Sequence, residues 1–243
     1  MLTARISRGA SQFITYAGLS GVIVGLTIAA RRAYPLLFQR FIGGADPVIA
    51  VTGICAVGAV LLFVLWRRDG FDVVRSQPAP GLLRAAGLAS LFGLVVIAVD
   101  FAIVHPADMN VPFPQSLLFY PVMALMVEIL FHALPLALLL TIAMPLVPSN
   151  LRPVIVPIGL VIVASLEPSY QLAAALTGAP VAGAPYTYTS ATLAFDSAQV
   201  FAINLSQLWL FRRYDFMSMC AMRLVYYAIW HIAWGHARLS VLF

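Results

Sequence analysis

Long apolar runs separated by short polar stretches make up most of the chain. Seven such runs stand out, at 13–30, 46–66, 82–104, 116–146, 153–177, 193–211 and 216–235. A helix of roughly 20 apolar residues is long enough to cross the hydrocarbon core of a bilayer. The pattern predicts an all-α, polytopic transmembrane bundle with about seven spanning segments. Because no long polar stretch leaves room for a soluble domain, we expect residues 1–243 to form a single integral membrane domain.

Prolines mark the fourth and fifth runs, and they predict departures from straight helices. The fourth run contains Pro121, Pro135 and Pro145, so we expect it to be tilted or kinked, and the fifth contains Pro157 and Pro168, where we expect a break. Proline, glycine and serine content predicts loops at 75–81 and 177–190.

Composition supports a membrane location. Hydrophobic residues make up 62% of the chain and charged residues 9%, far below the roughly 25% charged content of soluble domains. All fourteen basic residues are arginines, and they flank the apolar runs instead of forming one basic face. The net charge of +5 therefore indicates membrane topology and contact with lipid, and no nucleic-acid partner is expected. Cys55 and Cys220 lie in distant apolar runs, which favours two free, buried thiols.

The arginines also predict an orientation. Those at 5–8, 67–84, 152 and 212–213 all lie on one side if the N-terminus is cytoplasmic, whereas the group at 31–40 disagrees. A basic start followed by an apolar run resembles a signal anchor without a cleavage site. We therefore expect the N-terminus to be cytoplasmic.

The candidate site residues inside the apolar runs are Glu128, His132, Glu167, Arg223 and His231. Ionisable groups are costly in a bilayer and usually face a protein interior or a water-filled cavity. Their spacing predicts two polar helix faces, because Glu128 and His132 are four residues apart and Arg223, Tyr227 and His231 follow at intervals of four.

If these faces and Glu167 meet, the bundle contains a polar pocket. Such a pocket could bind a divalent metal such as zinc, or hold a water beside a carboxylate base. The alternative is that buried Glu–Arg pairs and histidine hydrogen bonds only tie helices together. We expect three other features to be structural. They are a solvated His105 in a loop, an interfacial His236, and aromatic residues at 226–234 that form an interface belt or pack in the core.

The segments "VEILFH" (127–132) and "LWLFRRYDFMSMCAMRLVYYAIWHIAWG" (208–235) resemble motifs of the CPBP family, the bacterial relatives of CAAX prenyl endopeptidases. The family's first motif is Glu-Glu-x-x-x-Arg, and Glu128 stands at its second Glu. His231 stands at the histidine of a final His-x-x-x-Asn motif. The resemblance covers about residues 115–236 and implies a bacterial inner-membrane peptidase.

The chain departs from the family pattern at several polar positions. Val127 stands at the first Glu, His132 at the Arg, and Gly235 at the final Asn. The family's middle motif, Phe-x-x-x-His, has no copy, and the nearest stretch in place is "VASLE" (163–167), which puts Glu167 at the histidine.

Three hypotheses follow from these residues. The first is an intramembrane peptidase that cleaves a membrane-embedded or lipidated peptide. The resemblance implies Glu128 as the base that activates water and His231 as a metal ligand or oxyanion donor. His132 and Glu167 could replace the metal ligands that the chain lacks. Arg223 and Tyr227 would support these residues. The second is a non-catalytic membrane subunit that binds or assembles a larger membrane complex. The third is a transporter, although no repeated halves are visible.

Overall fold

The computed structural model describes residues 2–148, 150–177 and 189–243, and the described chain is helical with no strand. The helices, in order, are α1 (Leu2–Ala33), α2 (Gln39–Ile42), α3 (Pro47–Asp69), α4 (Ala79–Ile103), η1 (Ala107–Met109), α5 (Ser116–Val127), η2 (Glu128–Ala133), α6 (Leu134–Leu146), α7 (Arg152–Thr177), α8 (Ser190–Arg213), α9 (Phe216–Tyr227), η3 (Ala228–Trp234) and α10 (Gly235–Val241).

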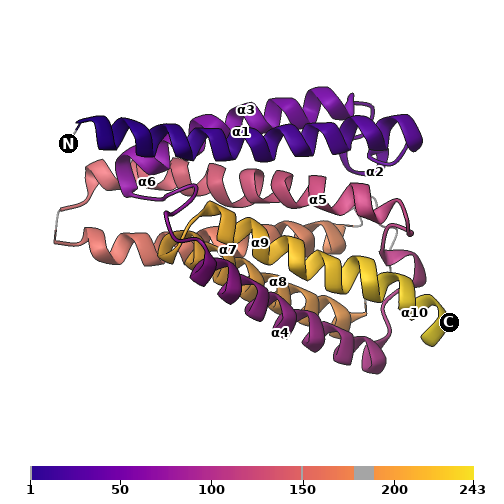
Figure 1. Cartoon of the computed structure of the whole chain (residues 1–243). Coiled ribbons are helices and arrows are strands. Elements are labelled where there is room, and N and C mark those ends of the chain that lie inside the picture. Colours follow the sequence, from indigo (N-terminus) through magenta and orange to yellow (C-terminus); the bar gives the residue numbers. More distant parts are fainter. Residues whose placement is uncertain (1, 149, 178–188) are drawn as a thin grey trace.

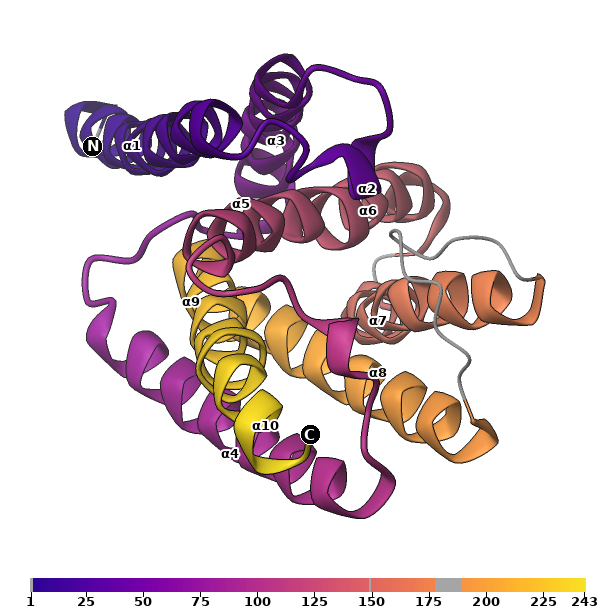
Figure 2. The ribbon, with the colours of Figure 1, turned by 90° about the vertical axis from the view of Figure 1, so that its right-hand side faces the viewer.

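The long helices run side by side and form one bundle (Figure 1). Helices α1 and α3 pack on each other along one side of the bundle and contact the continuous helix α5–η2–α6. Helices α4 and α8 pack against α9, and α7 packs against α8 and α6. Seen from one end, α9 lies among α4, α5 and α8 (Figure 2). This arrangement brings the fourth and last apolar runs of the sequence together in the interior.

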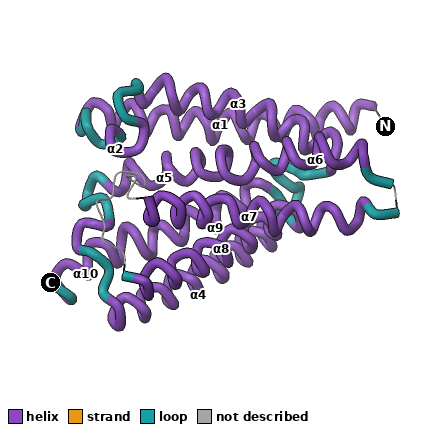
Figure 3. Tube along the Cα trace, turned by 180° about the vertical axis from the view of Figure 1, so that it is seen from behind, coloured by secondary structure: helices purple, strands orange, loops and turns teal. Residues whose placement is uncertain are grey.

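Local signals explain where helices begin and end. Helix α3 starts at Pro47, and the Asp46 carboxylate accepts hydrogen bonds from the backbone N–H groups of Val48 and Ile49. It ends at Gly70, whose φ of 68° lies in the left-handed region that glycine adopts without steric cost. Viewed from behind, the connecting loops gather at the two ends of the bundle (Figure 3).

Two short π-helical segments interrupt the central helices. The π-helical segment η2 lies just before Pro135. Proline has no N–H, and its ring would clash with the carbonyl four residues earlier in a regular α-helix. The N–H of Leu134 instead reaches the carbonyl of Ile129, five residues earlier. In η3 the N–H of Gly235 likewise reaches the carbonyl of Trp230. Each π-helical segment carries candidate site residues, as such segments often do.

The expected all-α membrane bundle is confirmed. Among the described residues, five helical stretches are long and apolar enough to cross a membrane: Gly9–Ala33, Pro47–Arg67, Ala79–Ile103, Ser116–Ala143 and Arg152–Leu176. The runs at 193–211 and 216–235 are also helical. Their polar side chains, which form the site described below, make these two runs less apolar. The expected break in the fifth run does not occur, since α7 continues through Pro157 and Pro168.

Apolar side chains from most of the helices fill the interior. One large cluster includes Phe119, Leu125 and Ile129 from the central helix, and a smaller one forms where α4 and α8 meet α9. Cys55 and Cys220 are both free and buried, as the sequence predicts. The two clusters surround the polar groups of the candidate site.

Candidate functional site

Arg223 of α9 is the centre of a buried polar network. Its Nε donates to Oε1 of Glu128 over 2.5 Å, and its NH2 group lies 3.3 Å from Oε2 of Glu167. The same NH2 group donates to the amide oxygens of Asn204 and Gln207, at 3.1 and 2.9 Å. One guanidinium therefore joins α5–η2, α7, α8 and α9.

Glu128 is completely buried, and three donors hold its carboxylate. His132 Nδ1 lies 2.6 Å from Oε2, and Oε1 accepts from both Arg223 and Gln207. His132 is also fully buried, and its Nε2 has no hydrogen-bond partner among the described residues. The predicted face with Glu128 and His132 therefore exists, and it points into the protein interior.

His231, on η3, is held by a different set of contacts. Its Nδ1 lies 2.6 Å from Oδ1 of Asn110, and its ring stacks on Tyr120 with centroids 4.6 Å apart. An amide oxygen can only accept a hydrogen bond, so Nδ1 carries the proton and Nε2 presents a lone pair. The ring also meets Tyr227 edge-on at 4.9 Å, and the Tyr227 hydroxyl is 3.3 Å from Arg223. Tyr227 therefore connects His231 to the Arg223 network.

A cavity of about 290 Å³ lies between these groups, and we call it the inner cavity. Its aromatic wall includes Tyr120, Phe131, Tyr226, Tyr227 and Trp230. Besides tyrosines, its polar lining residues are Glu167, Gln171, Asp196, Gln199, Asn204, Arg223 and His231. Neither Glu128 nor His132 lines it, whereas Val127 does. The carboxylate expected to act as base thus lies behind Arg223, away from the cavity.

The residues expected to bind a metal do not fit one. Among the described residues, no three His, Cys, Asp or Glu side chains gather so that they could hold a metal ion. A catalytic zinc usually needs three protein ligands. Here the Arg223 guanidinium occupies the space between the carboxylates of Glu128 and Glu167, and His132 Nδ1 faces Glu128. We derive no chemical step through a metal.

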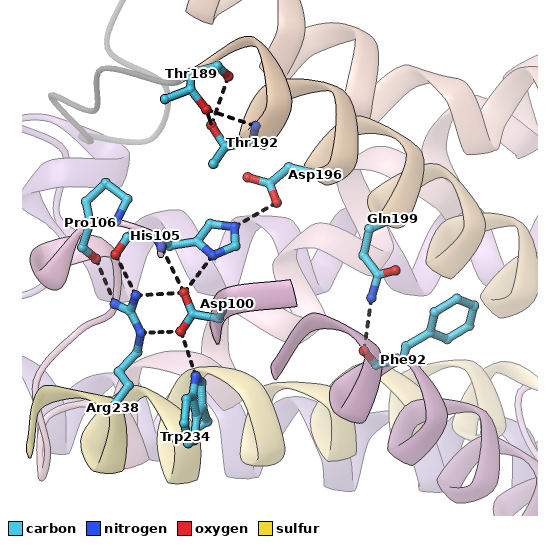
Figure 4. A network of polar contacts seen from close by, with 10 residues as sticks. All are labelled: Phe92, Asp100, His105, Pro106, Thr189, Thr192, Asp196, Gln199, Trp234 and Arg238. Atoms are coloured by element: carbon cyan, nitrogen blue, oxygen red, sulfur yellow. Dashed lines mark hydrogen bonds and ion pairs between the residues drawn. The ribbon is translucent and has the colours of Figure 1, made fainter. Parts of the chain in front are cut away.

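A second buried network lies around Asp100, near the end of α4 (Figure 4). Arg238 donates to both oxygens of Asp100, at 2.7 and 2.8 Å, and Trp234 Nε1 donates at 2.7 Å. Arg238 also donates to the backbone carbonyls of His105 and Pro106. The loop after α4 is therefore tied to α10 by one guanidinium.

The expectation of a solvated His105 is wrong. His105 is 1% exposed, with Nδ1 2.9 Å from Asp100 and Nε2 3.1 Å from Asp196 on α8. The loop folds inward because Arg238 binds its carbonyls, and this places the imidazole between two carboxylates. Burial lowers the pKa of His105, but the hydrogen bonds and charges of Asp196 and Asp100 outweigh it and raise that pKa above its ordinary value. His236, in contrast, is exposed, and its expected interfacial position stays a prediction.

The contacts join most of the residues singled out in the sequence. Glu128, His132, Glu167, Arg223 and Tyr227 form one hydrogen-bonded set, and His231 joins them at the cavity wall. Sequence reasoning missed the polar residues of α8 and the partners of His105 and His231. The missed residues are Asp100, Asn110, Asp196, Gln199, Asn204, Gln207 and Arg238. The polar residues of α8 recur mostly at intervals of three to five, and that spacing could have revealed them.

No family model, no curated protein and no solved structure matches the chain. The similarity to CPBP motifs therefore stays a prediction from the residues.

Proposed function

We propose that the protein is a non-catalytic membrane protein whose inner cavity binds a small amphipathic molecule. The observation that carries this proposal is the position of Glu128. It is 0% exposed, its carboxylate is engaged by three donors, and the neighbouring side chain on the cavity wall is Val127. A general base must come within hydrogen-bond reach of the proton that it removes. The observed contacts instead give Glu128 the role of fixing Arg223.

The inner cavity has the character of a ligand site. A volume of about 290 Å³ is at the lower end of the range for small-molecule pockets, which are mostly apolar with a few placed polar groups. The aromatic rings would contact the apolar part of the ligand, and Asp196, Glu167 and His231 would contact its polar part. Three of the enclosing helices, α4, α5 and α7, belong to stretches apolar enough to cross a membrane, so such a ligand would enter from lipid.

Filling the cavity tests this proposal. Val200 lines the inner cavity, whereas Val161 on α7 is 47% exposed on an outer face. We expect native mass spectrometry of the purified wild-type protein to detect a bound small molecule that Val200→Trp loses. Val161→Trp is the matched control and should keep it. Equal retention by both variants, at equal thermal stability, would contradict binding in this cavity.

A second candidate is the intramembrane peptidase that the resemblance implies. The observation in its favour is that Glu128 and His231 both lie on π-helical segments and that the His231 ring faces the inner cavity. In this case Glu128 would have to exchange its present donors for a water. We would compare peptide termini in membranes from cells with wild type and Glu128→Gln at matched expression. A terminus that disappears in the variant would favour hydrolysis, and an unchanged set would favour binding.

We further infer a bacterial inner-membrane location with a cytoplasmic N-terminus. The support is the arginine distribution, with most arginines on the side that would carry the N-terminus. Reporter fusions that are active on only one side of the membrane, placed at each terminus, would test it. Periplasmic activity of the N-terminal fusion would reverse the assignment.

A further inference from the structure

We infer that the polar part of the ligand is a protonated amine, bound beside Asp196 in the inner cavity. This inference rests on the proposed binding function and adds the chemical class of the ligand.

Two acceptors on the cavity wall have no hydrogen-bond partner among the described residues, Oδ2 of Asp196 and Nε2 of His231. The amide NH2 group of Gln199 donates to the carbonyl of Phe92 over 3.0 Å, and that of Asn204 donates to the carbonyl of Ala164 over 3.3 Å. Both amides thus turn their donors toward neighbouring helices and away from the cavity. His231 presents its Nε2 lone pair, because Nδ1 bonds to Asn110. A ligand that offers several N–H donors matches such a wall.

The charges near the cavity also favour a cation. Among the described residues, the two networks contain four carboxylates, those of Asp100, Glu128, Glu167 and Asp196. They contain two guanidinium groups, those of Arg223 and Arg238. Arg238 is engaged by Asp100, and Arg223 is shared between Glu128 and Glu167. Asp196 faces no guanidinium, and its partner is His105. A carboxylate whose partner is a titratable imidazole can exchange that imidazole's proton for a cationic ligand.

The hydrogen bonds of His105 place an exchangeable proton between His105 and Asp196. Asp100 accepts from the backbone N–H of His105 and from Trp234 and Arg238, so it is ionised and His105 Nδ1 donates to it. His105 Nε2 and Asp196 Oδ1 are 3.1 Å apart and share one further proton. A cation that binds Asp196 from the cavity would repel this proton. Ligand binding should therefore release a proton.

Aromatic rings complete the match. Tyr226, Tyr227 and Trp230 line the same cavity as Asp196. Cations are attracted to the faces of aromatic rings, and Trp is the strongest of them. Other titratable or charged groups near Asp196 and His105 are Tyr226 on α9, Asp100 on α4, Arg238 on α10, and Glu167 and Arg223 across the cavity.

A matched pair of probes tests the inference. 2-Phenylethylammonium and 2-phenylethanol have the same apolar body, and differ in carrying an ammonium or a hydroxyl group. We would measure both by isothermal titration calorimetry on the purified full-length protein, with Asp196→Asn as the variant. Asp108→Asn is the control, because it removes the same charge from a neighbouring cavity that Asp196 does not line.

We expect the amine to bind wild type at least about tenfold more tightly than the alcohol, the size of change that one charge-assisted hydrogen bond typically makes. Asp196→Asn should abolish this preference, and Asp108→Asn should keep it. Amine affinity should rise with pH as His105 loses its proton, and buffers of different ionisation enthalpy should reveal proton release.

The possible results distinguish an error in the inferred amine from an error in the proposed binding function. If both probes bind equally and Val200→Trp removes their binding, the inference of an amine ligand is overturned and the proposed binding function is kept. Failure of both probes to bind a folded wild-type protein would count against both. A preference for the amine that persists in Asp196→Asn would place the cation elsewhere and overturn the inference.

Discussion

The Arg223 guanidinium holds Glu128 over 2.5 Å through Nε and also contacts Glu167 at 3.3 Å, so one cation serves two carboxylates from different helices. All three residues are at most 8% exposed. A buried ion pair adds little over a well-packed apolar contact, but removal of one partner leaves a buried charge uncompensated. The arrangement is therefore sensitive to the loss of Arg223.

We predict that Arg223→Met destabilises the protein by about 3–5 kcal/mol, the usual cost of breaking a buried pair. Unfolding by denaturant in detergent, followed by intrinsic fluorescence, measures it. Arg152→Met is the control, because that side chain is exposed and bonds only weakly to the Val147 carbonyl at 3.5 Å. Equal stability of both variants would show that the carboxylates do not depend on Arg223.

His105 should make stability depend on pH. Its pKa is raised by Asp196 and Asp100 in spite of burial, so the folded state holds a proton more tightly than the unfolded state. The stabilisation is complete below the unfolded pKa of about 6.5 and is lost as pH rises through the raised folded pKa. We therefore expect the melting temperature to fall between neutral and mildly alkaline pH. His105→Gln should flatten this dependence, and the exposed His236→Gln should leave it unchanged; a slope that survives in His105→Gln would assign it to another group.

The apolar pattern was enough to predict most of the fold. All seven predicted runs contain helix, because apolar runs of this length in lipid satisfy their backbone hydrogen bonds only within a helix or a closed barrel. The effect of proline was harder to place. Pro135 follows a π-helical segment, yet Pro157 and Pro168 leave α7 continuous. Neighbouring helices can compensate for a missing N–H, and the local sequence does not report that compensation.

The site was predictable where it depends on helical spacing. Glu128 and His132 meet because they are four residues apart on one helix. The contact between Arg223 and Glu128 spans 95 positions and depends on how α9 packs against α5. His105 shows the limit most clearly, since its burial depends on Arg238, 133 positions away, binding the loop carbonyls.

Asp100 is the acceptor for one guanidinium, one indole and His105, and it is fully buried. We predict that Asp100→Asn lowers the free energy of unfolding by about 3–5 kcal/mol, because it leaves Arg238 without its counter-charge. Asp46→Asn is a matched control at the start of α3, where Asn caps a helix nearly as well as Asp and the change should cost less than about 1 kcal/mol. Thermal unfolding of both variants measures the difference. Similar losses would mean that the Asp100 charge is not what holds the loop.

Gly235 allows the Asn110 amide to approach η3 and bond to His231. A Cβ at Gly235 would lie 2.8 Å from Asn110 Nδ2, closer than side-chain atoms tolerate. We predict that Gly235→Ala destabilises the protein by about 1–3 kcal/mol, the typical cost of overpacking, and displaces Asn110 from His231. Gly87→Ala in α4 is the control, since nothing lies within 4 Å of its added Cβ and alanine favours a helix by about 1 kcal/mol. Thermal unfolding gives the stability change, and ¹⁵N spectra of labelled histidine report whether His231 keeps its proton on Nδ1. An unchanged His231 signal in a stable Gly235→Ala variant would mean that the close approach of Asn110 does not set the tautomer.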